Sequence, residues 1–384
     1  MSFDRRKFIQ VGAAAGAGAL LPLLGRAQGS GPIKIGAFGP MSGNAAAQGQ
    51  SLRQGAEMAA KAKNAAGGLL GRPIELIIGD DAGKPEEGAV IARRLATRDN
   101  VCIALGSVSS PVSLAAAQVF REEQVPQIVV SGTAQRITTQ GNEWVFRCTI
   151  PDRKFVADLV DFIHEKFPKL QRFGFIYVND DFGKGGFDSF VEAAKKYGMS
   201  VAAGESYTRG DVDFTAQLTK IRAANVEGIV DWSRYTEGAL IQRQLRQHSM
   251  SDLPRFGSDG IAPPAFLELA GEAANGVMYA THFSPATAAD NPVAVKWIEA
   301  FRKEYGKLPD YVHAQAYDAM NITIQAIERA KSIDRTAIRD ALRKTDYQSV
   351  RGPLKFDAKG DPTLVSHVVR IVNLKETNAR LMNP

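Results

Sequence analysis

Short apolar runs alternate with amphipathic stretches from residue 33 onward. Apolar runs of about four to eight residues bounded by turn-forming residues are typical of buried strands, and apolar residues three and four apart are typical of helices. After residue 47, Leu52, Ala56, Ala59 and Ala60 have the helical spacing. The pattern predicts strands over residues 33–38, 74–78 and 101–105, and helices over about 48–65 and 86–98.

The same order of elements occurs again between residues 173 and 232. A strand–helix–strand order calls for a parallel sheet with helices on both faces, so its repetition predicts an α/β protein with two such lobes of similar size. The second set comprises strands over 173–178, 201–204 and 228–232, a turn over 180–186, and helices over 186–197 and 214–224.

The order changes after residue 278. The pattern predicts helices over about 291–305, 311–330 and 335–344, then a hairpin-like tail with strands over 354–357 and 366–373 and a turn at 359–361. Between the two repeats, residues 147–152 form a short extended piece that contains Pro151. Such a piece favours a hinge between two lobes over a flexible tether.

Residues 106–133 combine turn and helix signals with several hydroxyl groups. Pro111 is well placed as the first residue of a helix. The hydroxyls of Ser109, Ser110 and Thr133 then lie where two parallel strands end, beside helix N-termini with unpaired N–H groups and partial positive charge. Two such turns at one crevice favour a carboxylate-binding site. The alternative is a serine that only caps the helix.

The first 27 residues have the pattern of an export signal. Arg5 and Arg6 precede a mildly apolar run that reaches Leu24, and a small-x-small cleavage site ends at Ala27. The segment resembles a twin-arginine signal; an ordinary secretory signal is the alternative. Either route predicts a periplasmic protein that begins at about Gln28.

Composition narrows the class of partner. The chain of 384 residues has 45% hydrophobic and 23% charged residues, the balance of a globular protein with two or three domains. Half of its net charge of +6 lies in the export signal, and later residues contain no basic block with interleaved aromatics, so we expect no nucleic-acid partner. Cys102 and Cys148 lie in apolar runs and are expected to be free thiols, with a disulfide as the alternative.

Catalytic and cofactor motifs are missing from the sequence. The histidines have no metal-ligand spacing, and no G-x-S-x-G elbow occurs. The segment 79–84 has one residue too few for a phosphate loop, and Pro85 replaces its Ser or Thr. The acidic pair Asp80-Asp81 is interpreted as turn-forming, with a metal site as the alternative. We therefore expect a binding protein with no catalytic residue, cofactor or metal.

A set of motifs in a fixed order carries a family resemblance over about 330 residues. They are IKIGAFGPMSG, NAAGGLLGRPIELIIGDDAGKPEEG, VPQIVVSGT, VNDDFGKGG, GSDGI and RGPLKFDAKGD. The chain resembles the leucine/isoleucine/valine-binding class of periplasmic solute receptors, which serve ABC importers. The resemblance implies a monomer that captures a small carboxylate-bearing solute, an amino acid of the branched-chain or hydrophobic type, and delivers it to a membrane permease.

The fold implied by the resemblance is the periplasmic binding protein-like type I fold. Its two doubly wound parallel-sheet lobes are joined by three hinge crossovers, with the ligand in the cleft between them. Lobe 1 is expected over residues 32–148 and 279–350, and lobe 2 over residues 151–276 and 354–384.

The resemblance also implies the residues of the ligand site. The two turns place the ligand's carboxylate at Ser109, Ser110, Gly132 and Thr133. The ammonium-binding acid falls on Asp259, and the aromatic residues around the ligand fall on Phe182, Tyr235 and Tyr317. The alternative for Asp259 is a turn-shaping role, and for Phe182 and Tyr317 a place in the core.

Two residues depart from the family pattern. Gln48 stands where the prototype receptors carry a bulky aromatic residue, so the side-chain pocket differs from theirs. Arg234 precedes Tyr235, and we expect it to be a solvated surface charge. If it pointed into the cleft, it would favour an aromatic or dicarboxylic acid, or an amide, as the ligand. A sensory receptor and, more distantly, an enzyme are the other interpretations.

Overall fold

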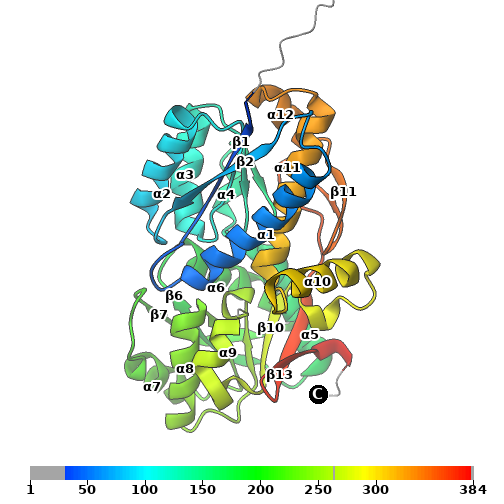
Figure 1. Ribbon diagram of the computed structural model, residues 1–384. Helices are drawn as coiled ribbons and strands as arrows, with labels where there is room; N and C mark the ends of the chain where they lie inside the picture. The colour runs from blue at the N-terminus through cyan, green and yellow to red at the C-terminus, as the bar shows by residue number, and fades with distance from the viewer. Residues whose placement is uncertain (1–30, 263, 382–384) are drawn as a thin grey trace, which may run out of the picture. The chain divides into compact units, whose positions relative to one another are not determined.

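The computed structural model describes residues 31–262 and 264–381. The predicted export signal, with Arg5 and Arg6, lies outside these residues. Two separate β-sheets organise residues 32–381, one built from residues 33–147 and the other from residues 172–378 (Figure 1).

The first sheet has five parallel strands in the order β2-β1-β3-β4-β5. Its strands are β1 (Ile33–Gly39), β2 (Ile74–Asp80), β3 (Ala104–Leu105), β4 (Gln127–Val129) and β5 (Val145–Arg147). The second sheet has seven strands in the order β14-β13-β10-β9-β8-β6-β7. Its strands are β6 (Arg172–Val178), β7 (Ser200–Tyr207), β8 (Gly228–Trp232), β9 (Arg255–Gly257), β10 (Val277–Thr281), β13 (His367–Val372) and β14 (Lys375–Asn378).

Helices cover both sheets. They are α1 (Ala46–Ala65), α2 (Pro85–Arg93), α3 (Ser110–Glu122), α4 (Arg136–Thr139), α5 (Asp152–Lys166), α6 (Asp181–Ala194), α7 (Thr215–Ala223), α8 (Tyr235–Gln247), α9 (Pro264–Ala270), α10 (Pro292–Tyr305), α11 (Tyr311–Ala330) and α12 (Arg335–Leu342). On the first sheet, α1 packs with α11 and α2 packs with α3 (Figure 1). On the second sheet, α5 packs with α6 and α8 packs with α9. This arrangement confirms the predicted α/β fold with doubly wound parallel sheets.

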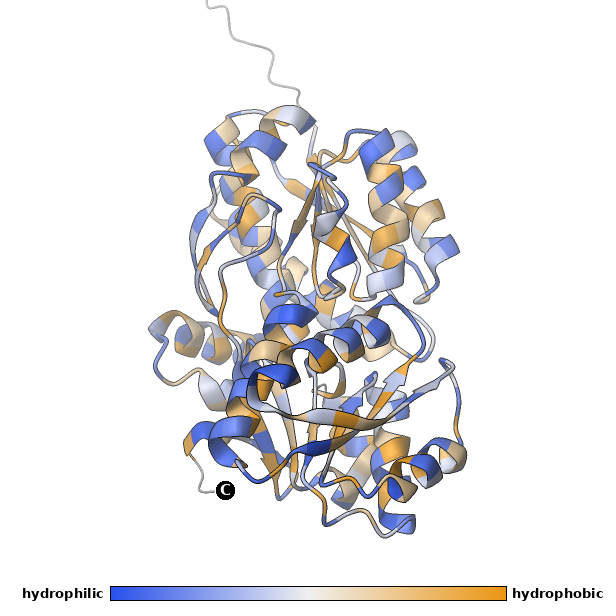
Figure 2. Ribbon diagram, turned by 180° about the vertical axis from the view of Figure 1, so that it is seen from behind, coloured by the Kyte–Doolittle hydropathy of each residue, from blue (hydrophilic) through white to orange (hydrophobic). Residues whose placement is uncertain are grey.

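Apolar residues hold these layers together. Phe38 and Phe120 lie fully buried between the first sheet and its helices α2 and α3, and Phe173, Phe190 and Trp232 do so in the second sheet. Figure 2 shows hydrophobic residues along the strands and mixed faces on the helices. The helices therefore bury one face each, as the spacing of apolar residues predicts.

The chain passes between the two halves of the molecule three times, after β5, after β10 and after β12 (Gly352–Lys355), a strand of a third, two-stranded sheet. Two of these connections are joined by a buried ion pair, because Arg147 Nη2 lies 2.6 Å from Asp361 Oδ1. The sheets assign β10 to the second half of the molecule, and the exact lobe boundaries stay a prediction.

The C-terminal tail differs from its prediction. Residues 354–357 do not pair with residues 366–373: β12 pairs with β11 (Asp346–Ser349), and β13 pairs with β10 and β14. The turn signal at 359–361 belongs to a connection between the sheets, where Asp361 is held by Arg147. The turn expected over 180–186 is also shorter, because Asp180 caps α6 through hydrogen bonds from the N–H groups of Phe182 and Gly183.

Within residues 31–262 and 264–381, no helix combines the length and the apolar character needed to cross a bilayer. Cys102 and Cys148 are both buried free thiols.

Candidate ligand-binding site

The order of the strands points to one place in each sheet. In a doubly wound sheet, ligands bind beyond the carboxyl ends of two neighbouring strands whose connections leave in opposite directions. In the first sheet these strands are β1 and β3, and in the second they are β6 and β8. The residues that follow them include Gln48, Ser110, Phe182 and Arg234, which all line one cavity.

That cavity has a volume of about 20 Å³ and lies between the two halves of the molecule. Four of the predicted ligand residues line it: Ser110, Thr133, Phe182 and Asp259. Six further residues line it that were not assigned to the site: Gln48, Val108, Ser131, Arg234, Gly260 and Tyr311. Residues separated by up to about 260 positions in the sequence are thus brought together by the two sheets.

On the side of the first sheet, the cavity wall is built by the two predicted turns. Ser110 Oγ accepts hydrogen bonds from the backbone N–H groups of Thr133 and Ala134, both 3.1 Å long. Its own proton therefore remains available for donation. Neither Ser109 nor Ser110 acts as a side-chain cap of α3, because the N-cap residue Ser109 makes no capping hydrogen bond.

Arg147 holds the second of these turns, residues 132–134, in place. Its buried guanidinium donates to the carbonyls of Thr133, at 2.9 Å, and Ala134, at 3.0 Å, while Asp361 balances its charge. Because carbonyls in three consecutive positions, 132 to 134, face one guanidinium, the N–H and hydroxyl groups of the turn are directed elsewhere. Arg147 is a positioning residue for the cavity wall.

Asp259 supplies an uncompensated buried carboxyl group on the opposite wall. It is 3% exposed, and its Oδ2 has no hydrogen-bond partner among the described residues. His282 Nδ1 lies 3.9 Å away, too far for a hydrogen bond, and burial lowers the pKa of His282 well below its ordinary value. Burial, with the nearby Asp152 carboxylate, raises the pKa of Asp259 well above its ordinary value. A cation in the cavity would stabilise its charged form.

Arg234 lies in the cavity, and the expectation that it is a solvated surface charge is wrong. It is 8% exposed, its Nη1 lies 2.8 Å from Asp180 Oδ2, and its guanidinium stands 5.3 Å from the centre of the Phe182 ring. Burial opposes its charge, but the carboxylates around it, Asp180 above all, outweigh burial and raise the pKa of Arg234. Asp180 thus caps α6 with one oxygen and holds Arg234 with the other.

Gln48 and Tyr311 form a hydrogen-bonded pair on the wall of the first half. Gln48 Nε2 donates to the Tyr311 hydroxyl at 2.7 Å, and both side chains are buried. Tyr311 is the first residue of α11. The sequence predicted that Tyr311 begins a helix, but nothing near it in the sequence indicated that this end of the helix faces the two turns.

Gly260 also lines the cavity, next to Asp259. A Cβ atom at this position would stand 2.3 Å from the backbone oxygen of Ser233. The absence of a side chain therefore lets the turn after β9 approach the turn after β8, which brings Asp259 and Arg234 to the same cavity.

The other predicted ligand residues lie beside the cavity or away from it. Ser109 and Gly132 are buried next to lining residues, and Tyr235 is buried with its side chain near the backbone of Ala47 in the opposite half. Tyr317 does not line the cavity: it packs against Trp297, with ring centres 5.3 Å apart. It follows Tyr311 by six residues on α11, about 9 Å along the helix axis, and so faces other neighbours.

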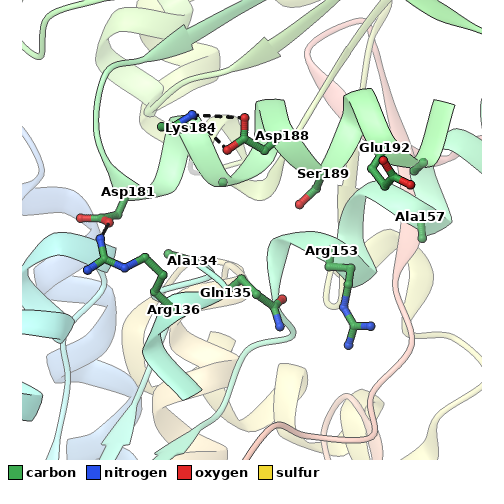
Figure 3. A pocket seen from close by; sticks show the side chains of 12 residues that line it. Ala134, Gln135, Arg136, Arg153, Ala157, Asp181, Lys184, Asp188, Ser189 and Glu192 are labelled. Atoms are coloured by element: carbon green, nitrogen blue, oxygen red, sulfur yellow. Dashed lines mark hydrogen bonds and ion pairs between the residues drawn. The ribbon is translucent and has the colours of Figure 1, made fainter. Parts of the chain in front are cut away.

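A larger groove of about 580 Å³ lies close to this cavity. Figure 3 shows α6 on one side of it, and residues 134–136 and α5 on the other. Four of its charged side chains form two pairs, Arg136–Asp181 at 2.7 Å and Lys184–Asp188 at 3.1 Å. Solvent screens such exposed pairs, so the groove offers weaker electrostatic discrimination than the buried cavity.

Contacts outside the cavity join the two halves directly. Arg136 of the first half pairs with Asp181 of the second. The Thr236 hydroxyl donates to the Asn44 carbonyl at 3.1 Å, and Arg209 donates to the Gly83 carbonyl. These contacts form only when the two halves are close, so the structure has the arrangement of a closed cleft.

In the part of the chain that the structure describes, no group of three or more His, Cys, Asp and Glu residues is placed so that it could hold a metal ion. Asp80 instead accepts hydrogen bonds from the N–H groups of Met41 and Ala82, as a turn-forming residue does.

Two doubly wound sheets with a buried polar cavity between their switch points define a two-lobed solute-binding protein. Residues 32–379 match the family model described as periplasmic binding protein, and the chain belongs to this family. The resemblance seen in the sequence motifs is confirmed at the level of the family, whose members are solute receptors of ABC importers rather than enzymes.

Three similar proteins illustrate the relationship. Leu/Ile/Val-binding protein homolog 3 of Brucella melitensis biotype 1 is 30% identical over 332 residues, which cover 86% of this chain and 88% of that protein. A leucine binding protein, LivK, from Thermotoga maritima MSB8 has 30% identity and a TM-score of 0.85, covering 91% of this chain and 100% of that one. LivJ from Streptococcus pneumoniae, solved in complex with isoleucine, has 29% identity and a TM-score of 0.83, with 90% and 97% covered.

Proposed function

We propose that this protein is a periplasmic receptor that captures an α-amino acid between its two halves and delivers it to the permease of an ABC importer. The export signal pattern in residues 1–27 and the family of the chain support the location and the partner. The relatives named for leucine, isoleucine and valine support an amino acid as the ligand.

The observation that carries the proposal is the buried carboxyl group of Asp259. A buried charge without a partner is costly, and Asp259 Oδ2 has no hydrogen-bond partner among the described residues. The ammonium group of an amino acid would supply a cationic partner. Its carboxylate would then meet the Ser110 hydroxyl, the Thr133 turn and the N-terminus of α3 on the facing wall.

Access to the cavity requires movement of the two halves. A volume of about 20 Å³ is close to that needed for one water molecule, far less than an amino acid occupies. The solute therefore binds when the cleft is open, and closure by bending at the three connections surrounds it. Only the interactions that form on closure, with Asp259, Arg234 and Phe182, shift the population toward the closed form.

A second candidate ligand is an aromatic carboxylic acid without an amine. It is favoured by the position of Arg234 against the Phe182 ring inside the cavity. Against it stands Asp259, which such a ligand would leave buried without a partner.

Matched pairs of ligands test the proposal on the wild-type protein. Isothermal titration calorimetry and thermal melts would compare leucine with 4-methylpentanoate, glutamine with 4-carbamoylbutanoate, and phenylalanine with 3-phenylpropanoate. Each pair keeps the carboxylate and removes the amine, and benzoate is added as a shorter aromatic acid. A tight ligand raises the melting temperature by mass action.

The expected result is that at least one amino acid binds and that loss of its amine weakens binding at least tenfold. Tighter binding of benzoate or of an amine-free acid would support the second candidate instead. If no compound of either series bound, the proposal of an amino-acid receptor would be refuted.

A further inference from the structure

The cavity is lined mainly by polar side chains. Val108 and Phe182 are the wholly apolar side chains that line it in the described part of the chain; apart from Gly260, the other lining residues present amide, hydroxyl, guanidinium and carboxyl groups. Burying a leucine or isoleucine side chain gives about 1.5–3 kcal/mol when it is surrounded by apolar groups. Against this wall, an aliphatic side chain would instead take polar groups away from water without pairing them.

Arg234 is a buried polar group of the cavity with donors to spare. Its Nη1 is buried and lies 2.8 Å from Asp180, but has no hydrogen bond of good geometry among the described residues. The Phe182 ring beneath the guanidinium limits its freedom to turn away. A guanidinium has five N–H donors, so Arg234 retains capacity for an acceptor on the ligand.

The acceptor that fits Arg234 is neutral, because the charge of Arg234 is already balanced. Asp180 pairs with it directly, and the carboxylate of Glu237 also attracts it. A second carboxylate at this point would add negative charge to a buried region that already holds Asp259 and Asp152. Like charges in a poorly solvated site repel strongly.

The opposite wall suits a group that both donates and accepts hydrogen bonds. Gln48 donates to the Tyr311 hydroxyl, which also interacts with the Ser131 hydroxyl, so the carbonyl oxygen of Gln48 remains as an acceptor and the hydroxyls remain as the donors of this wall. The Ser131 hydroxyl lines the same cavity. A carboxamide, with a carbonyl oxygen toward Arg234 and an NH₂ group toward Gln48, is complementary to these groups.

We propose that the ligand is an α-amino acid with a neutral side chain that carries a carbonyl or hydroxyl oxygen, of which the carboxamide of glutamine is the simplest case, and that Arg234 selects this side chain by hydrogen bonding. The inference rests on the proposed amino-acid receptor function and narrows its ligand from α-amino acids in general to those with a neutral polar side chain.

The test compares glutamine, glutamate and leucine by calorimetry on the wild-type protein and on Arg234→Leu. The control is Arg243→Leu, which removes an exposed arginine from α8, the helix that directly follows Arg234. The double variant Arg234→Leu/Asp180→Asn guards against misfolding, because it removes both partners of the ion pair and keeps a capping residue at the start of α6. Circular dichroism and melting curves establish that each variant is folded.

The expected order of affinity in the wild type is glutamine first, with leucine and glutamate at least tenfold weaker. Arg234→Leu and the double variant should lose at least tenfold in glutamine affinity and favour leucine over glutamine, while Arg243→Leu keeps the wild-type order.

Leucine binding as tightly as glutamine in the wild type would overturn the inference and leave the amino-acid receptor function standing. Glutamate binding more tightly than glutamine would overturn the neutral side chain. Unchanged glutamine affinity in folded Arg234→Leu would remove Arg234 as the selecting residue. Failure of every amino acid to bind, with binding of an amine-free acid, would overturn both this inference and the proposed function.

Discussion

Replacing Asp259 by asparagine separates binding from stability more sharply than any other single change. The substitution keeps the shape of the side chain and removes its negative charge. In the closed arrangement of the two halves, the carboxyl group is 3% exposed and its Oδ2 has no hydrogen-bond partner among the described residues. Removing its negative charge should therefore stabilise this arrangement. In the complex, the same change leaves the ligand's ammonium group buried without a counter-charge.

The size of the loss follows from that stranded charge. Truncating one partner of a buried, hydrogen-bonded charge pair costs about 2–5 kcal/mol of binding free energy. At about 1.4 kcal/mol for each factor of ten, the dissociation constant for an amino acid should rise about 30-fold to about 4,000-fold. An amine-free acid should show the reverse trend, because it has no ammonium group to strand.

Two measurements on Asp259→Asn check this reasoning. Calorimetry gives the dissociation constants of an amino acid and its amine-free analogue, and thermal melts without ligand give the stability. The expected pattern is a higher melting temperature, by a few degrees at about 2–4 °C per kcal/mol, together with weaker amino-acid binding. An amino-acid affinity within threefold of the wild-type value, or a lower melting temperature without ligand, would refute the assignment of Asp259 as the unpaired ammonium partner.

Three further predictions concern residues around the cavity. Burial raises the pKa of Asp152 to about 7, so the stability contributed by this carboxyl group is lost as pH rises from about 4 to 7. Asp152→Asn should therefore melt above the wild type at pH 8, and in a melting series the difference should shrink toward pH 4. Arg147→Met leaves the Asp361 carboxylate buried without its partner and should lower the free energy of unfolding, measured with denaturant, by about 3–5 kcal/mol. Adding Asp361→Asn should restore part of that loss, and full stability of the single variant would contradict the buried pair. Arg209→Ala removes the hydrogen bond from Arg209 to the Gly83 carbonyl, which joins the two halves when they are closed. It should weaken the affinities of two different ligands, measured by calorimetry, by the same factor, and a change in the ratio of the two affinities would contradict a role in closure alone.

The alternation of apolar and amphipathic segments was sufficient to predict most of the elements. The helices predicted over 291–305, 311–330 and 335–344 agree with α10, α11 and α12 to within two residues. Each helix has apolar residues at helical spacing and is preceded by a capping residue, which for α11 is Asp310. Local interactions therefore set the bounds of these helices. The tail could not be predicted this way, because the partners of β12 and β13 are chosen by sheets formed elsewhere in the chain.

The residues of the candidate site were also predictable only where local sequence fixes their position. The sequence placed hydroxyl groups in the turns at Ser110 and Thr133, since their strands, the proline and the following helix are neighbours in the chain. It did not predict the position of Arg234. Whether that side chain faces solvent or the cavity depends on Asp180 and Phe182, more than 50 residues earlier, which approach it only because β6 and β8 pair.

The sequence by itself thus determined a repeated α/β architecture, an export signal pattern and two hydroxyl-bearing turns where parallel strands end, because each depends on residues close together in the chain. The tertiary structure alone decided the chemistry of the cavity. Packing between the two halves brings Gln48, Tyr311, Arg234 and Asp259 to one enclosed space, and enclosure is what leaves Asp259 uncompensated and Arg234 short of an acceptor. Burial and pairing are properties of the folded chain, and they govern which solute the two halves can close upon.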